Sequence, residues 1–145
     1  MKETYYLNTN ELPTIPVPHD CIIKEINLEE DCLVFVFEDD ISYHDSIKNI
    51  FPAARSLTIK YHFVNDIYDI SLFMRDKPNR ILHKAGVFKE IELPDEREVF
   101  LNLPKNNLEY LYHNVGYCSI IIKLWSSTNI ILDMSVDYVE FKWVC

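Results

Sequence analysis

The amino-acid sequence predicts a mainly β domain: an antiparallel β-sandwich or partly closed barrel of about 7 to 9 strands, with one short helix near residues 107–115. Short runs in which apolar and polar residues alternate recur between turn-forming residues along the chain. Glycine occurs only at Gly86 and Gly116, which excludes the glycine-rich phosphate loops of nucleotide-binding α/β folds. The last strand-like run also changes the face that carries its apolar residues, as a strand does when it passes between two parts of a bent sheet.

The first part of the chain predicts an extended segment followed by a β-hairpin. Residues 1–18 are poorly patterned, and we expect regular structure to begin at about Cys21. Three prolines keep this segment extended: Pro13, Pro16 and Pro18. Residues 21–28 and 32–38 are apolar runs joined by an acidic turn, which is typical of a hairpin. The second run is apolar on both faces, which indicates a central strand covered on both sides.

The middle of the chain predicts one helical turn and several short strands. Residues 42–54 are irregular, with a helical turn that ends before Pro52. In residues 56–64 apolar and polar side chains alternate, so we expect a strand with one buried face. Further strand-like runs follow at residues 67–75, 81–84, 87–93 and 98–103.

One segment departs from the two-residue period of a strand. Its apolar residues recur at the spacing of one helix face: Leu108, Leu111, Tyr112 and Val115. Asn106 followed by Glu109 has the form of a capping box, and Gly116 fits just past a helix end. The pattern therefore predicts a short amphipathic helix over residues 107–115.

The last third predicts a long hairpin of residues 117–125 and 130–144 around a polar turn. In the final run one set of apolar residues alternates first: Ile130, Leu132, Met134, Val136 and Tyr138. A second set then alternates on the opposite parity: Val139, Phe141 and Trp143. Because a shift of one residue exchanges the two faces of a strand, we expect a β-bulge or bend near Tyr138.

The size and composition of the chain predict a single cytoplasmic domain over residues 1–145. No internal repeat or linker divides its 145 residues, a length typical of one domain. The apolar runs are far shorter than the ~20 residues that a bilayer span requires, and the first residues lack the apolar core of a signal peptide. None of the four cysteines forms a C-x-x-C pair, and Cys21, Cys32 and Cys118 lie in or beside apolar runs, so we interpret these three as small apolar residues and expect no metal and no cofactor.

The net charge of −9 limits the kinds of partner, because nucleic acids and anionic membranes repel an acidic chain. Acidic residues are concentrated in residues 20–45, and basic residues gather in residues 75–89. One interpretation is solubility and charged protection of sheet edges; the other is an acidic face that steers a basic protein partner. The candidate partner-binding residues of that face are Glu29, Glu30, Asp39 and Asp40.

The sequence contains no strong catalytic motif. The steps His19-Asp20 and His44-Asp45 match metal-dependent phosphohydrolases over two residues only, and such residues more often cap turns. Histidine spacings typical of zinc sites and the G-x-S-x-G elbow are absent from the sequence. If the protein binds a small ligand, the pocket candidates are Tyr61, His62 and His83.

The opening of the chain resembles a known group of proteins. The stretch from Pro18 to Ile26, with its His19-Asp20 step, precedes an acidic turn and the apolar run Leu33–Phe37. In this it is similar to the opening of small bacterial β-rich immunity-type proteins of polymorphic toxin systems. The resemblance implies a non-enzymatic protein that binds and neutralises a toxin domain, often a basic nuclease.

These observations favour a non-catalytic protein-binding module of the immunity type that binds a basic partner. Two alternatives stay open: a small-ligand-binding or enzymatic β-barrel or sandwich, and a structural subunit of an assembly. The oligomeric state is also open, because nothing in the sequence fixes it.

Overall fold

The computed structural model describes residues 1–65, 69–75, 88–91 and 96–145, which form nine antiparallel strands in one sheet. The mainly β prediction is therefore confirmed. The strands are β1 (Lys2–Tyr6), β2 (Ile22–Leu28), β3 (Cys32–Phe37), β4 (Ser56–Phe63), β5 (Ile70–Arg75), β6 (Phe88–Glu90), β7 (Leu108–Gly116), β8 (Ser119–Trp125) and β9 (Asn129–Val144). The helical segments are α1 (Asp45–Ile50), α2 (Glu96–Asn102) and the 3-10 helix η2 (Leu103–Asn106). No helix among the described residues is long and apolar enough to cross a membrane.

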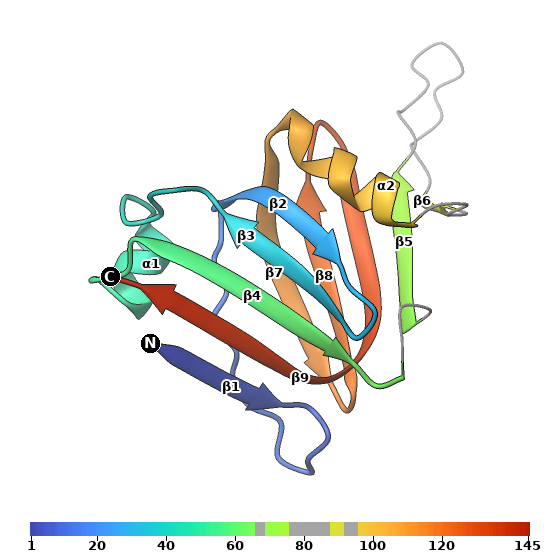
Figure 1. The fold of residues 1–145 in the computed structure, drawn as a ribbon, viewed down its shortest axis with the longest axis horizontal. Coiled ribbons are helices and arrows are strands. Elements are labelled where there is room, and N and C mark those ends of the chain that lie inside the picture. Colours follow the sequence, from blue (N-terminus) through green and yellow to red (C-terminus); the bar gives the residue numbers. More distant parts are fainter. Residues whose placement is uncertain (66–68, 76–87, 92–95) are drawn as a thin grey trace.

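The sheet bends into two layers, and β9 belongs to both (Figure 1). The strand order is β4-β3-β2-β7-β8-β9-β5-β6, and β9 also pairs with β1 and β4. We call β1, the second half of β9, β4, β3 and β2 the first layer. The second layer holds β7, β8, the first half of β9, β5 and β6. Because β4 pairs with β9, the pairing continues from β4 through β3, β2, β7 and β8 back to β9.

The change of layer occurs at a β-bulge in β9. Phe63 of β4 is opposite Val136, whereas its neighbour His62 is opposite Tyr138, so Asp137 is an extra residue on β9. Val136 and Val139 are both buried, although their parities differ. The bend predicted near Tyr138 is therefore confirmed.

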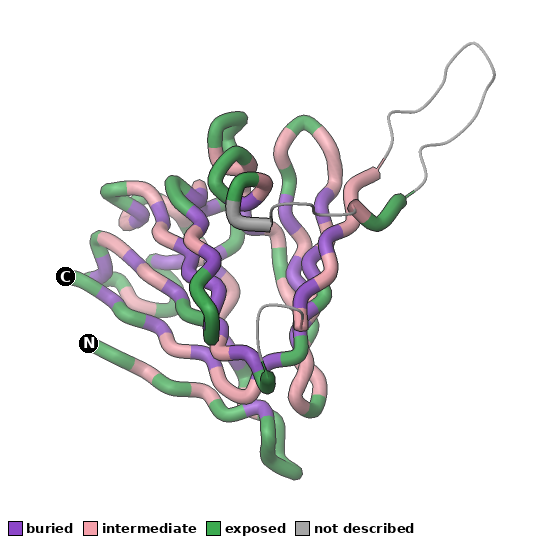
Figure 2. Tube along the Cα trace, turned by 45° about the vertical axis from the view of Figure 1, so that its right-hand side comes forward, coloured by how far each residue is buried: buried purple, intermediate pink, exposed green. Residues whose placement is uncertain are grey.

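Buried and exposed positions alternate along the strands (Figure 2). The buried side chains are apolar and form one core cluster between the layers. One polar relay crosses this interior. The Tyr61 and Tyr110 hydroxyls are 3.3 Å apart, and the Tyr110 hydroxyl is 2.5 Å from Nδ1 of His113. His113 Nε2 lies 3.1 Å from the Ile15 carbonyl oxygen. Since that oxygen can only accept, Nε2 carries the proton and Nδ1 accepts from Tyr110; burial lowers the pKa of His113, in agreement with a neutral ring.

The helix predicted over residues 107–115 is wrong, because this segment is strand β7. Asn107 adopts the left-handed conformation (φ 54°) that ends the 3-10 helix η2, so the asparagines are a helix C-terminal signal and not an N-terminal one. A register shift between Tyr110 and Tyr112 in the pairing with β8 then displaces the apolar residues by one position. This bulge gives a strand the apparent spacing of a helix face.

Two further predictions need correction. Residues 98–103 are predicted as a strand, but α2 covers most of them, and among its described side chains Phe100 lies fully in the core. Regular structure also begins before Cys21, because β1 pairs with β9 from Lys2 to Tyr6. An edge strand of five residues has too few alternations to show a period. The run predicted at residues 81–84 lies outside the described residues.

The remaining strand predictions are confirmed where the structure describes them. The hairpin of β2 and β3 has the predicted acidic turn, and β3 is buried on both faces except at Val36. Helix α1 ends before Pro52, and β4 buries Leu57, Ile59, Tyr61 and Phe63. The final hairpin of β8 and β9 turns at Ser126–Thr128.

Candidate binding face

The outward side chains of β1, β9, β4 and β3 share one side of the first layer, which we call the outer face; on β3, Cys32 and Val34 are buried although they lie on this side. Strand register arranges these side chains in three cross-strand rows, because directly opposite residues share a face. The rows are Tyr6–Tyr138–His62–Cys32, Thr4–Glu140–Lys60–Val34 and Lys2–Lys142–Thr58–Val36. Residues from four separate parts of the chain therefore meet on a single surface.

The first of these rows is aromatic. The rings of His62 and Tyr138 stack, with centroids 4.1 Å apart and an interplanar angle of 12°. Tyr6 packs on the other side of Tyr138 at 5.8 Å and is 54 % exposed. Partial desolvation and the nearby carboxylates Glu140 and Asp31 raise the pKa of Tyr138. We call Tyr6, Tyr138 and His62 the aromatic row.

Glu140 is the charged centre of the outer face, and its side chain is only 15 % exposed. Its Oε2 lies 2.5 Å from Lys2 Nζ, and its Oε1 lies 2.6 Å from His62 Nε2. The hydrogen bond from Lys2 is the main cause that lowers the pKa of Glu140. The contact with His62 lowers the pKa of Glu140 further.

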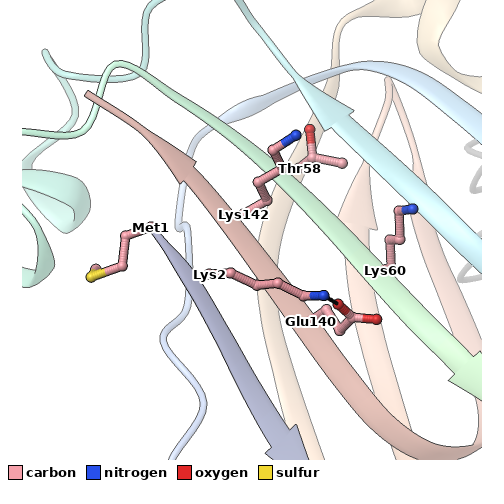
Figure 3. Close-up of a pocket in the computed structure, with 6 residues that line it drawn as sticks. All are labelled: Met1, Lys2, Thr58, Lys60, Glu140 and Lys142. Atoms are coloured by element: carbon pink, nitrogen blue, oxygen red, sulfur yellow. Dashed lines mark ion pairs between the residues drawn. The ribbon is translucent and has the colours of Figure 1, made fainter.

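A hollow of about 330 Å³ lies beside Glu140 on this face (Figure 3). We call it the lysine hollow, after the type of residue that dominates its lining. The lining residues are Met1, Lys2, Thr58, Lys60, Glu140 and Lys142. They come from β4, β9 and the start of the chain at β1, so the hollow depends on the pairing of three strands.

The turn between β2 and β3 places three exposed carboxylates next to Cys32, which lies opposite His62 at the β3 end of the aromatic row. We call Glu29, Glu30 and Asp31 the acidic turn. The Asp31 carbonyl oxygen accepts a hydrogen bond from the Phe63 amide at 2.8 Å, which fixes the turn against β4. Among the described residues, no lysine or arginine lies within ion-pair distance of the acidic turn.

Ligand atoms of Glu29, Asp31 and Cys32 lie within 4.8 Å of one another, and no other such group of three occurs in the described part of the chain. Cys32 Sγ donates to Glu29 Oε2 at 3.1 Å. Burial, followed by the Glu29 hydrogen bond, raises the pKa of this thiol to about 12. Metals bind the thiolate, so this group is a poor metal site at neutral pH.

The structure separates the four predicted partner-binding residues into two pairs. Glu29 and Glu30 precede β3, whereas Asp39 and Asp40 follow it, and a strand of six residues spans about 20 Å. Asp39 forms an ion pair with Lys24 at 2.7 Å. Asp40 accepts hydrogen bonds from the Ser42 amide and hydroxyl, which lower the pKa of Asp40. The second pair is thus engaged in local structure.

The predicted ligand-pocket residues do not share a pocket. Tyr61 points into the core and is 1 % exposed, whereas His62 points outward to Glu140. His83 lies outside the described residues.

The two His-Asp steps contact neighbouring parts of the folded chain. His19 Nδ1 lies 2.8 Å from the Leu111 carbonyl oxygen, and Asp20 has a left-handed φ of 67°. His44 Nε2 lies 2.5 Å from Glu38 Oε1. Ser46 Oγ donates to the His19 carbonyl oxygen at 2.8 Å, so the two steps are neighbours. Their side chains join the proline-rich segment and α1 to the sheet.

Cys32 is directly opposite His62 on the outer face, and His62 contacts Glu140. Thiol hydrolases combine the same types of residue: a cysteine, a histidine and a third group that orients the histidine. The raised pKa of Cys32 argues against this chemistry, because a nucleophilic cysteine requires a lowered pKa. Burial likewise raises the pKa of Cys21 to about 12. All four cysteines are free, and Cys21 and Cys32 are buried.

We expect Cys21 and Cys32 to react with iodoacetamide much more slowly than Cys145 at neutral pH. The thiolate population at a pKa of about 12 is lower by roughly a thousandfold than at an ordinary value. Cys145 is exposed and serves as the internal control. Peptide mass spectrometry after timed alkylation measures each site, and in denaturant the rates should converge. Fast labelling of Cys32 in the folded protein contradicts the prediction.

A second hollow, of about 280 Å³, lies on the outer side of the second layer. Its lining is mostly apolar: Phe88, Leu111, Tyr112, Lys123, Asn129, Ile130 and Ile131. Lys123 lies over the Tyr112 ring at 4.7 Å and donates to its hydroxyl. The one charged side chain of the lining is therefore already engaged with Tyr112.

Comparison with known proteins adds no functional information: no family model, curated protein or solved structure matches the chain. The function therefore has to be argued from the outer face. This surface combines an aromatic row, an acidic turn and a lysine hollow. Sequence analysis missed Tyr6, Tyr138, Glu140, Lys60 and Lys142; only the alternation of residues 58–62 and 138–142 could have indicated the polar sides of two strands.

Proposed function

We propose that the protein is a non-catalytic protein-binding module and that it binds a basic protein through the aromatic row and the acidic turn. The observation that carries the proposal is their adjacency. Tyr6, Tyr138, His62 and Cys32 lie directly opposite one another in register, and the acidic turn ends at Cys32. Aromatic anchors next to unpaired charges are typical of protein-binding surfaces.

The aromatic row supplies the contact area. Tyrosine is enriched among the residues that contribute most to protein–protein affinity, since its ring buries a large area at a small cost in side-chain entropy. Tyr6 is 54 % exposed, and its ring packs at a tilt against Tyr138, which itself stacks on His62. Little ordering is therefore needed when a partner binds.

The acidic turn supplies electrostatic steering. Its carboxylates are exposed, and no described cation neutralises them, so their field reaches the solvent undiminished by ion pairing. Complementary charge accelerates association and selects among partners. The lysine hollow on the same face repels a basic partner, which favours docking at the acidic end.

The resemblance to immunity-type proteins makes a basic toxin domain the partner class that we propose. Inhibition of such a domain requires only that its active surface be covered, so no catalytic group is needed. The alternative of a ligand inside the barrel is less favoured, because apolar side chains and the relay of Tyr61, Tyr110 and His113 fill the interior.

We expect Tyr138→Ala to weaken binding of the partner by about tenfold or more. The partner is the protein retained from a lysate of the source organism by the wild-type chain, and its affinity is measured by calorimetry. Tyr138→Phe keeps the stacked ring and should bind nearly as the wild type. Tyr43→Ala is the matched control, since Tyr43 is 58 % exposed but lies near Asp40 at the other end of β3. Equal losses in Tyr138→Ala and Tyr43→Ala refute the proposed surface.

A further inference from the structure

The lysine hollow places like charges next to one another in a chain whose net charge is −9. Lys2 is directly opposite Lys142 in the pairing of β1 with β9. Lys60 is directly opposite Glu140, and Glu140 and Lys142 are two residues apart on the same face of β9. Like charges at opposed positions destabilise a sheet. Such a conflict between local interactions and folding is characteristic of functional sites.

The charges of the hollow are only partly neutralised. Glu140 pairs with Lys2, whereas neither Lys60 nor Lys142 forms an ion pair with any residue that the structure describes. The lining side chains carry three ammonium groups and one carboxylate, a net side-chain charge of +2, while the Met1 ammonium donates to the Trp143 carbonyl oxygen at 2.8 Å. A ligand that neutralises the side chains of the hollow therefore carries two negative charges.

We propose that the lysine hollow binds the phosphate group of a small phosphate monoester. Phosphate offers acceptor oxygens in several directions, which suits ammonium groups that arrive from β1, β4 and β9 as separate point charges. Lys60 and Lys142 contact the phosphate oxygens, and the Thr58 hydroxyl donates a neutral hydrogen bond. Glu140 and His62 hold Lys2 in position at the edge of the hollow.

The size of the hollow favours an ester over free phosphate. Its volume of about 330 Å³ lies within the usual range for small-molecule sites, roughly 300–1,000 Å³. The phosphate occupies only part of that space, and the organic part of the ester fills the remainder between Met1 and Thr58. This site is distinct from the proposed protein-binding surface, because its phosphate contacts come from the other two rows of the outer face.

Titration of the ¹⁵N-labelled protein with glycerol phosphate, followed by NMR, tests the site without any protein partner. We expect saturable amide shifts at Thr58, Lys60 and Lys142, and weaker binding of inorganic phosphate at the same residues. The double variant Lys60→Gln/Lys142→Gln should raise the Kd by at least about tenfold, because charge-assisted hydrogen bonds are lost. Lys142→Arg keeps the charge and should retain binding.

The matched control is Lys48→Gln/Lys105→Gln, which removes the same charge from exposed positions elsewhere. Its Kd should equal that of the wild type. Glycerol phosphate should also raise the Tm of the wild type but not that of Lys60→Gln/Lys142→Gln. Shifts that grow linearly and match those of sodium chloride at equal ionic strength overturn the proposal. Equal loss of binding in the two double variants overturns it as well.

Discussion

Phe141→Ala is expected to lower the free energy of unfolding by about 3–5 kcal/mol, the cost of a large cavity in a packed core. Phe141 is 1 % exposed and lies in the half of β9 that joins the first layer. Its ring meets Tyr5 edge-on at 5.5 Å and Trp143 at 5.7 Å, so truncation removes contacts to both β1 and the end of β9. Urea denaturation followed by circular dichroism measures the change.

The neighbouring variant Lys142→Gln is the control for this prediction. Lys142 is exposed, and its replacement should change the free energy of unfolding by less than about 0.5 kcal/mol. If the two variants unfold at the same urea concentration, Phe141 does not lie in the core between the layers, and the observed packing of β9 against β1 and β4 is wrong.

Glu29→Lys/Glu30→Lys is expected to slow association with the basic partner by about 10- to 100-fold at low ionic strength. The change reverses the field of the acidic turn at the end of the aromatic row. Stopped-flow fluorescence measures the association rate constant. Because the Debye length is only about 3 Å at 1 M salt, the rates of variant and wild type should converge as salt is added.

Asp39→Lys/Asp40→Lys makes the same change of charge at the other end of β3 and therefore isolates position from net charge. These carboxylates already contact Lys24 and Ser42, and we expect a much smaller effect on the association rate. If both variants slow association equally, the partner responds to the overall charge of the chain. The acidic turn would then have no special part in binding.

The strand architecture was predictable where burial imposes a strict period. In β9 the apolar residues change parity between Val136 and Val139, and a bulge follows because each apolar side chain must face a core. The same reasoning located the hairpin of β2 and β3. The alternation of apolar and polar residues was sufficient to predict these strands, since a long strand with one buried face repeats that alternation many times.

The pattern misled where an irregularity interrupts a strand. The bulge in β7 between Tyr110 and Tyr112 imitates helical spacing, and a single-sequence periodicity has no means of separating the two. Asn107 could have decided the matter only if its left-handed φ of 54° had been known. The aromatic and β-branched content of the segment, with Tyr110, Tyr112 and Val115, was the contrary signal.

The binding face was less predictable than the fold, because it depends on register between distant strands. Tyr6 and Tyr138 are neighbours only through the pairing of β1 with β9, and neither has an unusual sequence context. The acidic residues were visible as a composition, but β3 separates Glu30 from Asp39. Nearness in sequence therefore gave a false impression of one surface.

The central place of β9 also determines when the protein can fold during its synthesis. β1, β4, β5 and β8 all precede β9 in the chain and all pair with it. Until the ribosome has released β9, these strands keep unpaired edges and exposed apolar faces, which are prone to association with other chains. The sheet therefore requires β9 to complete its pairing, and we expect its folding to be largely all-or-none.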